Sequence, residues 1–239
     1  MRSLYGEGVR DGVPIALGYL SVSFGFGISA VNGGLSPVLA VLISLTNLTS
    51  AGQVAGLDII LKAGTVVEMI LTQLIINARY FLMSLSLSQR LDGSFTTRHR
   101  FLSAFGITDE IYGVASSKKG LLRPSYMYGL ILLPLIGWTM GTLLGAVAGS
   151  LLPAALKNAL GIAIYGMFVA IVVPPAKRER GVLVATLLAV AVSCALAFIP
   201  LFSFVTSGFS VIISALVAAT IAALLFPVPD TDGETGVTK

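Results

Sequence analysis

An apolar run from Gly64 to Leu87 is long enough to cross a lipid bilayer, yet it carries several polar side chains. A membrane-crossing helix needs about 20 mostly apolar residues, so this run predicts a transmembrane helix. Polar side chains are costly at membrane depth and normally face protein or a water-filled cavity. Here they are Glu68, Thr72, Gln73, Asn77 and Arg79. The helix is therefore predicted to lie inside a bundle, which first suggests membrane transport.

The polar residues of this run fall on two stripes of the predicted helix. At 3.6 residues per turn, Glu68 and Arg79 lie on nearly one stripe. Asn77 lies on the other, with Gln73. Arg79 needs an acidic neighbour or an anionic ligand, and Glu68, Asp109 and Glu110 are the candidate neighbours. A static ion pair is the alternative to substrate binding.

The whole chain has the composition of an integral membrane protein. Of its 239 residues, 56% are hydrophobic and only 11% are charged, whereas soluble domains average about 25% charged residues. We expect an all-α polytopic helical bundle of about seven transmembrane helices. The seven apolar runs are 12–31, 36–57, 64–88, 126–150, 154–174, 181–200 and 209–226.

An eighth apolar segment, Phe101–Ser117, is short and contains Asp109 and Glu110. It is predicted to enter the protein without crossing, although eight spans are possible. The positive-inside rule gives the same count of basic residues for both models, so the side of the N-terminus stays open. Both models place the C-terminus in the cytoplasm. Residues 1–226 are predicted to form one transmembrane domain, and 227–239 a polar, disordered cytoplasmic tail.

Four glycines recur at every fourth position of one predicted helix: Gly137, Gly141, Gly145 and Gly149. A ridge of small residues lets another helix approach closely, so we expect tight helix packing along it. Residues 17–37 also resemble residues 136–153, with glycine, an aromatic residue and a closing proline in the same order. This similarity is consistent with an inverted repeat of three helices, as in many secondary transporters. The alternative is a chance similarity between two glycine-rich helices.

Three polar clusters interrupt the apolar chain. Thr49, Ser50 and Gln53 follow the second run and predict a broken helix whose free backbone groups bind a zwitterion or an ion, unless they only cap a helix end. Asn77 and Arg79 form the second cluster. Asp109 and Glu110 form the third; they are candidates for binding an amine or relaying protons, and helix capping is the alternative.

Enzyme signatures are absent from the sequence. It contains no GxxxxGK[ST] phosphate loop, no HExxH and no GxSxG turn, so we expect no enzyme activity, no ATPase and no cofactor. The single cysteine, Cys194, has no partner for a disulfide and no metal-ligand spacing surrounds it. Basic residues cluster in a few loops without interleaved aromatics, which indicates membrane topology and not nucleic-acid binding.

The polar clusters resemble a known family in their order and spacing. The segments GVRDGVPIALGY (8–19), AGQ (51–53), NARY (77–80) and TDE (108–110) are similar to those of the AzlC family of branched-chain amino-acid permeases. This resemblance implies a multi-pass protein of a prokaryotic cell membrane that exports branched-chain amino acids with a small AzlD-type membrane subunit. The family usually reads Asn-Leu-Arg-His where this chain has Asn77-Ala78-Arg79-Tyr80, so a role of that histidine does not transfer.

Secondary export of a small amino acid is thus the leading hypothesis. Arg79, or backbone N–H groups near Thr49–Gln53, would bind the carboxylate, and Glu68, Asp109 or Glu110 would bind the ammonium group. One of these three acids is also the candidate for coupling to a proton gradient. The alternatives are a passive channel for small solutes and a structural membrane subunit whose polar residues only hold helices together.

Overall fold

The computed structural model describes residues 3–151, 153, 166, 169 and 172–227. They belong to two compact units, Met1–Met167 and Phe168–Lys239, which are considered separately. The predicted fifth span, 154–174, and the tail that follows residue 227 lie almost wholly outside the described residues. The all-α prediction is confirmed: among the described residues the secondary structure is helical apart from one isolated bridge between Leu91 and Leu122.

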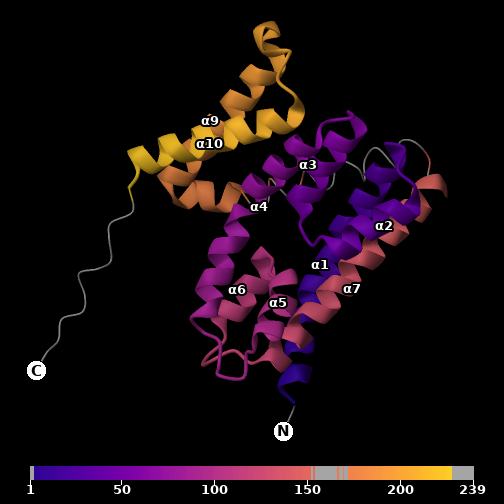
Figure 1. The fold of residues 1–239 in the computed structure, drawn as a ribbon, viewed down its shortest axis with the longest axis vertical. Helices are drawn as coiled ribbons and strands as arrows, with labels where there is room; N and C mark the ends of the chain where they lie inside the picture. The colour runs from indigo at the N-terminus through magenta and orange to yellow at the C-terminus, as the bar shows by residue number, and fades with distance from the viewer. Residues whose placement is uncertain (1–2, 152, 154–165, 167–168, 170–171, 228–239) are drawn as a thin grey trace, which may run out of the picture. The chain divides into compact units, whose positions relative to one another are not determined.

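The described residues of unit 1 form three long helices and four short ones (Figure 1). The long helices are α1 (Leu4–Asn32), α4 (Val66–Ser88) and α7 (Pro124–Leu151). The short helices come in two pairs, α2 (Pro37–Thr46) with α3 (Ser50–Leu61), and α5 (Thr97–Phe105) with α6 (Asp109–Ser117). By length and composition, α1, α4 and α7 are candidate membrane spans.

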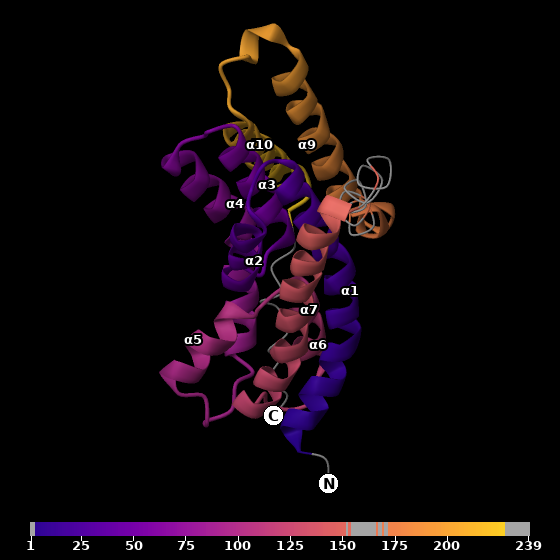
Figure 2. The ribbon, with the colours of Figure 1, turned by 90° about the vertical axis from the view of Figure 1, so that its right-hand side faces the viewer.

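The centre of unit 1 is the pair α1 and α7, which lie side by side in both ribbon views (Figures 1 and 2). Their backbones are in contact through glycines on both helices. A Cβ added at Gly27 would overlap the Thr142 carbonyl oxygen, and one added at Gly145 would overlap that of Phe24. Without side chains at these positions, the two helices approach to backbone contact, which increases dispersion contacts along the seam.

The two central helices run in the same direction. Gly8, early in α1, lies against Tyr126, early in α7, whereas Gly27 lies against Thr142, late in α7. An inverted repeat of 17–37 and 136–153 would require its first helices to be antiparallel. The observed parallel pair contradicts that repeat for α1 and α7, so the sequence similarity reflects the shared glycine seam.

The predicted second span, 36–57, does not form one helix. Asn47 and Thr49 adopt extended backbone angles between α2 and α3, where the chain turns back. Leu61, the last residue of α3, packs against Gly33 at the end of α1, close to where α2 begins. The segment is therefore a helical hairpin that enters unit 1 and leaves it at the same end.

A second hairpin, α5 and α6, enters unit 1 from the opposite end. The guanidinium of Arg90, which follows α4, donates hydrogen bonds to the carbonyls of Ser116 and Lys118 at the end of α6. The turn between α5 and α6 reaches Tyr19 in the middle of α1. Each helix has nine residues, about 14 Å at 1.5 Å per residue and too short to cross a bilayer.

Among its described residues, unit 2 contains two long apolar helices, α9 (Arg180–Phe198) and α10 (Ser207–Leu225), both candidate membrane spans. A short 3₁₀ turn, Pro200–Phe202, lies between them. Gly181, at the start of α9, packs against Phe226, just after α10, so the two helices are antiparallel. Five candidate spans are thus present among the described residues, and they match five of the seven predicted apolar runs.

Candidate functional site

The tips of the two hairpins meet α4 near the middle of unit 1. Thr49, at the tip of α2 and α3, donates a hydrogen bond from its hydroxyl to Asn77 Oδ1 at 2.8 Å. Asp109, at the tip of α5 and α6, forms an ion pair with Arg79 at 2.5 Å. Arg79 also donates a hydrogen bond to the hydroxyl of Tyr80, the next residue of α4, at 3.4 Å. Two breaks in regular structure therefore converge on one stretch of α4.

Each tip is also the start of a capped helix. The Thr49 hydroxyl accepts a hydrogen bond from the Gly52 N–H, and the Thr108 hydroxyl accepts one from the Ile111 N–H. Threonine favours this position because its side-chain oxygen replaces a missing intrahelical acceptor. The N-terminal ends of α3 and α6, which carry partial positive charge, are thus both placed at this level.

Amide side chains connect the first hairpin internally and to its neighbours. Gln53 donates to the Asn47 carbonyl at 2.5 Å and accepts from the Ser44 hydroxyl at 3.2 Å. The Ser44 hydroxyl also meets Thr142 of α7 at 2.7 Å. On α4, Gln73 donates to the Gly52 carbonyl at 2.8 Å. Backbone groups freed by the helix break are therefore partly satisfied by side chains, as an apolar surrounding requires.

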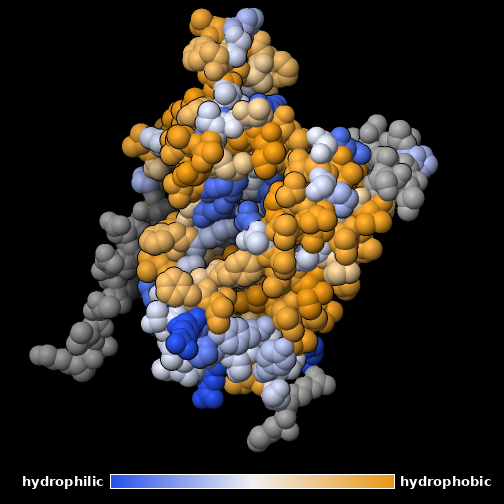
Figure 3. Space-filling view, turned by 45° about the vertical axis from the view of Figure 1, so that its right-hand side comes forward, coloured by the Kyte–Doolittle hydropathy of each residue, from blue (hydrophilic) through white to orange (hydrophobic). Residues whose placement is uncertain are grey.

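A cavity of about 300 Å³ lies at this break. Its polar wall consists of side chains and backbone from the end of α2, the first turn of α3 and α4: Thr46, Asn47, Gly52, Gln53 and Gln73. Its apolar wall consists of Ile43, Gly56, Ile60 and Met69. Figure 3 shows hydrophilic residues gathered in a hollow of an otherwise largely apolar face.

The Arg79–Asp109 pair is neither sealed in the protein nor fully open. Their side chains are 39% and 35% exposed, and the guanidinium also lies over the Tyr80 ring, 5.0 Å from its centre. Asp109 is thus the neighbour that the structure selects from the three predicted acids. Glu68 lies eleven residues earlier on α4, about 16 Å along the helix, and is buried near Gly64.

The other predicted acid, Glu110, is held by a different residue. The Tyr19 hydroxyl lies 2.5 Å from Glu110 Oε2 and 2.5 Å from Thr108 Oγ1. Tyr19 is buried and stacks edge-on against Trp138 of α7, with ring centres 5.3 Å apart. The second hairpin is therefore attached to the central helix pair through Tyr19, and to α4 through Arg79.

The structure brings most of the predicted site residues together and separates a few. Those near the hairpin tips are Thr49, Ser50, Gln53, Asn77, Arg79, Asp109 and Glu110. Glu68 lies apart from them. The packing residues Gly137, Gly141 and Gly145 lie against α1 backbone at Ala16, Leu20 and Phe24, whereas the surroundings of Gly149 are outside the described residues.

Several residues of this region are not evident from the sequence. Tyr19, Ser44, Trp138 and Thr142 sit in glycine-rich or apolar stretches without a polar cluster around them. The Trp138 indole N–H and the Thr72 hydroxyl are buried without a hydrogen-bond partner among the described residues. The signal in the sequence was a single polar side chain within an apolar helix, because a buried polar group usually has a hydrogen-bond partner or a functional role.

Comparison with known families identifies the family of the chain. The profile of the AzlC family, described as "AzlC protein", matches residues 14–152, which cover more than half of the chain and most of unit 1. The chain belongs to the AzlC family. Its relatives are membrane proteins, and no solved structure matches it.

Two relatives cover most of the chain. The "Inner membrane protein YgaZ" of Escherichia coli strain K12 is 29% identical over 233 residues, 94% of this chain and 93% of the relative. An "Uncharacterized membrane protein" of Archaeoglobus fulgidus is 31% identical over 180 residues, 74% of this chain and 78% of the relative. This AzlC-family protein is therefore a multi-pass membrane protein.

Proposed function

We propose that this AzlC-family protein is a secondary transporter that exports branched-chain amino acids or close analogues, with a small AzlD-type membrane subunit. The observation that carries this proposal is the convergence of two helical hairpins from opposite ends on one polar stretch of α4. Interrupted helices that meet at mid-depth are typical of secondary-transporter binding sites, because their free ends bind ions and zwitterions.

The cavity at the α2–α3 break has complementary ends for a zwitterion. The first turn of α3 presents N–H groups with partial positive charge to a carboxylate, and the end of α2 presents carbonyls to an ammonium group. Ile43, Ile60 and Met69 supply an apolar wall for a branched side chain. Gln53 bridges the same α2 carbonyls, so an ammonium group would compete with its amide.

Arg79 and Asp109 are the candidate side chains for binding the carboxylate and ammonium groups of the substrate. Arg79 would bind the carboxylate through a planar, bidentate fork, and Asp109 would then be released to take an ammonium group or a proton. Exchange of the internal partner for a substrate leaves no charge unpaired. Glu68 and Glu110 remain the other proposed coupling groups.

Counterflow in proteoliposomes tests the transporter against its alternatives. Vesicles containing the protein, with and without the small subunit, are loaded with unlabelled leucine and given labelled leucine, valine or isoleucine. Saturable accumulation of label that depends on the internal substrate supports secondary transport. Non-saturable flux without counterflow indicates a channel, and the absence of any flux in either preparation indicates a structural subunit.

The cavity itself is tested by Gln73→Met, which keeps the side-chain length but removes the hydrogen bonds to Gly52 and Asn77. We expect at least a tenfold loss of counterflow, about 1.4 kcal/mol. Ser21→Ala is the matched control because the Ser21 hydroxyl is exposed and bonds only within its own helix. Equal counterflow by both variants would exclude this cavity as the binding site.

A further inference from the structure

A second cavity lies at the end of unit 1 that carries the basic loops, between α4, α5 and α7. Its volume is about 130 Å³. The apolar lining comes from Leu87, Leu91, Phe95, Ala104, Ile107 and Met127. Ser84, where the lining begins on α4, is five residues after Arg79, about 8 Å along the helix, and none of the hairpin-tip residues belongs to the lining.

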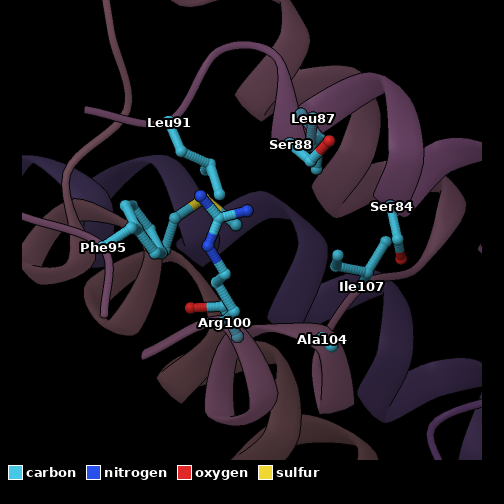
Figure 4. Close-up of a pocket in the computed structure, with 10 residues that line it drawn as sticks. Ser84, Leu87, Ser88, Leu91, Phe95, Arg100, Ala104 and Ile107 are labelled. Carbon is cyan, nitrogen blue, oxygen red and sulfur yellow. The ribbon is translucent and has the colours of Figure 1, made fainter. Parts of the chain in front are cut away.

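Two polar groups of this cavity have no side-chain partner among the described residues: the guanidinium of Arg100, an exposed residue, and the buried hydroxyl of Ser103. Figure 4 shows the Arg100 side chain extending from α5 toward Leu91, with its guanidinium beside Phe95. Among the described residues Arg100 forms no ion pair, although Lys118 pairs with Glu7 and Arg123 with Asp92. Ser103 lines the cavity and is only 5% exposed. Its hydroxyl is buried and has no hydrogen-bond partner among the described residues.

The walls that hold these groups are well packed. Phe95 packs edge-on against His99, and His99 Nδ1 lies 2.6 Å from the Tyr128 hydroxyl of α7. Ile107 and Met127 are 9% and 1% exposed. Packing thus holds these wall residues in place before a ligand binds, which lowers the cost of association, whereas the exposed Arg100 side chain would be ordered by the ligand.

We propose that this cavity is a binding site for a small apolar monocarboxylate, distinct from the α2–α3 cavity and beyond the transport proposed above. The guanidinium of Arg100 binds the carboxylate in a charge-assisted, bidentate manner. Ser103 donates its unused hydroxyl to the same group. A cavity of about 150 Å³ holds benzene, so this one accepts an apolar group of about five carbons.

The lining also discriminates between ligand classes. It contains no Asp or Glu among the described residues, so an ammonium group would lose its water without gaining an acidic partner. A branched carboxylic acid or 2-oxo acid is therefore favoured over the amino acid with the same carbon skeleton. A phospholipid fits less well, because its glycerol and two acyl chains need more room than a cavity of about 130 Å³ offers.

Calorimetric titration of the protein in phosphatidylcholine nanodiscs tests the site with three probes of one skeleton: 4-methylpentanoate, leucine and isopentylamine. We expect 4-methylpentanoate to bind, and neither leucine nor isopentylamine to show binding that depends on Arg100. Arg100→Gln should weaken 4-methylpentanoate binding at least tenfold. Arg98→Gln is the matched control, because Arg98 is on the same helix but does not line the cavity.

Ser103→Ala separates a ligand role from a structural one. Removal of a buried hydroxyl without a partner should leave the melting temperature unchanged or raise it, while 4-methylpentanoate binding weakens. Unchanged binding in both Arg100→Gln and Ser103→Ala would overturn the proposal. So would leucine binding that is equally tight and lost in Arg100→Gln, or loss of the carboxylate signal when phosphatidylglycerol is included, which would identify a lipid as the occupant. Leucine transport does not enter these readouts.

Discussion

Arg79 has two alternative roles in this structure, substrate binding and ion pairing with Asp109. It is paired with Asp109 and is 39% exposed, so it is available to a ligand and also satisfied without one. Lysine keeps the charge but loses the planar fork. We expect Arg79→Lys to insert normally and to lose at least tenfold in amino-acid efflux from vesicles.

Paired neutralisation separates binding from scaffolding. If Arg79 only neutralises Asp109, the double variant Arg79→Gln with Asp109→Asn leaves no unpaired charge and should restore efflux. If Arg79 binds substrate, this double variant stays inactive. Arg79→Gln with Glu110→Gln is the control, since Glu110 contacts Tyr19 instead. Wild-type efflux from the first double variant would reduce Arg79 to a structural residue.

Tyr19 is a second residue-scale test, because it was not among the predicted site residues. Tyr19→Phe keeps the packing against Trp138 but removes the hydroxyl contacts to Thr108 and Glu110. We expect a loss of stability of about 1 kcal/mol and slower efflux, because the second hairpin is less firmly attached. Thermal unfolding and efflux measure the two effects. Tyr5→Phe, at an exposed tyrosine of the same helix, should change neither.

At the scale of elements, the glycine seam between α1 and α7 determines how closely these helices pack. Gly141 lies against Leu20 and Ser23, and Gly145 against Phe24. Leucine at either position must displace the backbone of α1, which typically costs 1–3 kcal/mol or more. We expect Gly141→Leu and Gly145→Leu to lower yield, melting temperature and efflux.

Gly18 provides the matched control for the seam, since a Cβ there would meet nothing within 4 Å. Gly18→Leu should behave as wild type, because glycine-to-leucine replacement in a helix carries no intrinsic penalty. If Gly141→Leu and Gly18→Leu have the same yield and melting temperature, the seam does not limit packing. The predicted packing at Gly149 stays a prediction, because the surroundings of this residue lie outside the described residues.

At the scale of the whole molecule, the ends of unit 1 differ in charge. Lys118 pairs with Glu7, and Tyr126 donates to Asp11, so the start of α1 shares its end with the basic loops. Figure 3 shows strongly hydrophilic residues at the end near the N-terminus. The basic residues on this end are Arg10, Arg90, Arg98, Arg100, Lys118, Lys119 and Arg123, whereas Lys62 is at the other end.

The positive-inside rule therefore predicts an orientation that the sequence left open, in which the start of α1 and the basic loops face the cytoplasm. We expect single cysteines at Ser3, Arg98 and Lys119, in a Cys194→Ser background, to be labelled from the same side of the membrane. Lys62→Cys should be labelled from the opposite side. Labelling of Arg98→Cys and Lys119→Cys from different sides would mean that residues between them cross, contrary to the α5–α6 hairpin.

What the sequence determined by itself depends on local composition. The apolar runs predict the five long helices of the described residues, and the spacing of Gly137, Gly141 and Gly145 predicts a close helix contact. The polar residues of α4 predict the face that meets the hairpin tips, but the predicted interior position of this helix is not observed, because only Glu68, Thr72 and Leu87 of α4 are buried. Threonine and amide residues at 46–53 predict a break in a helix. These features can be read from one segment at a time, because hydrophobic length and periodicity are local properties.

Only the tertiary structure decided the direction of the chain and the choice of partners. The chain turns back after Asn47, so that α3 returns to the end of unit 1 where α2 begins. Gln53 and Ser44 bond across this break, and Ser44 also bonds Thr142, nearly one hundred residues away. Asp109 pairs with Arg79 because the second hairpin reaches α4 at that level, whereas Glu68 is three turns away. These contacts depend on how distant segments pack, which no single segment of the sequence encodes.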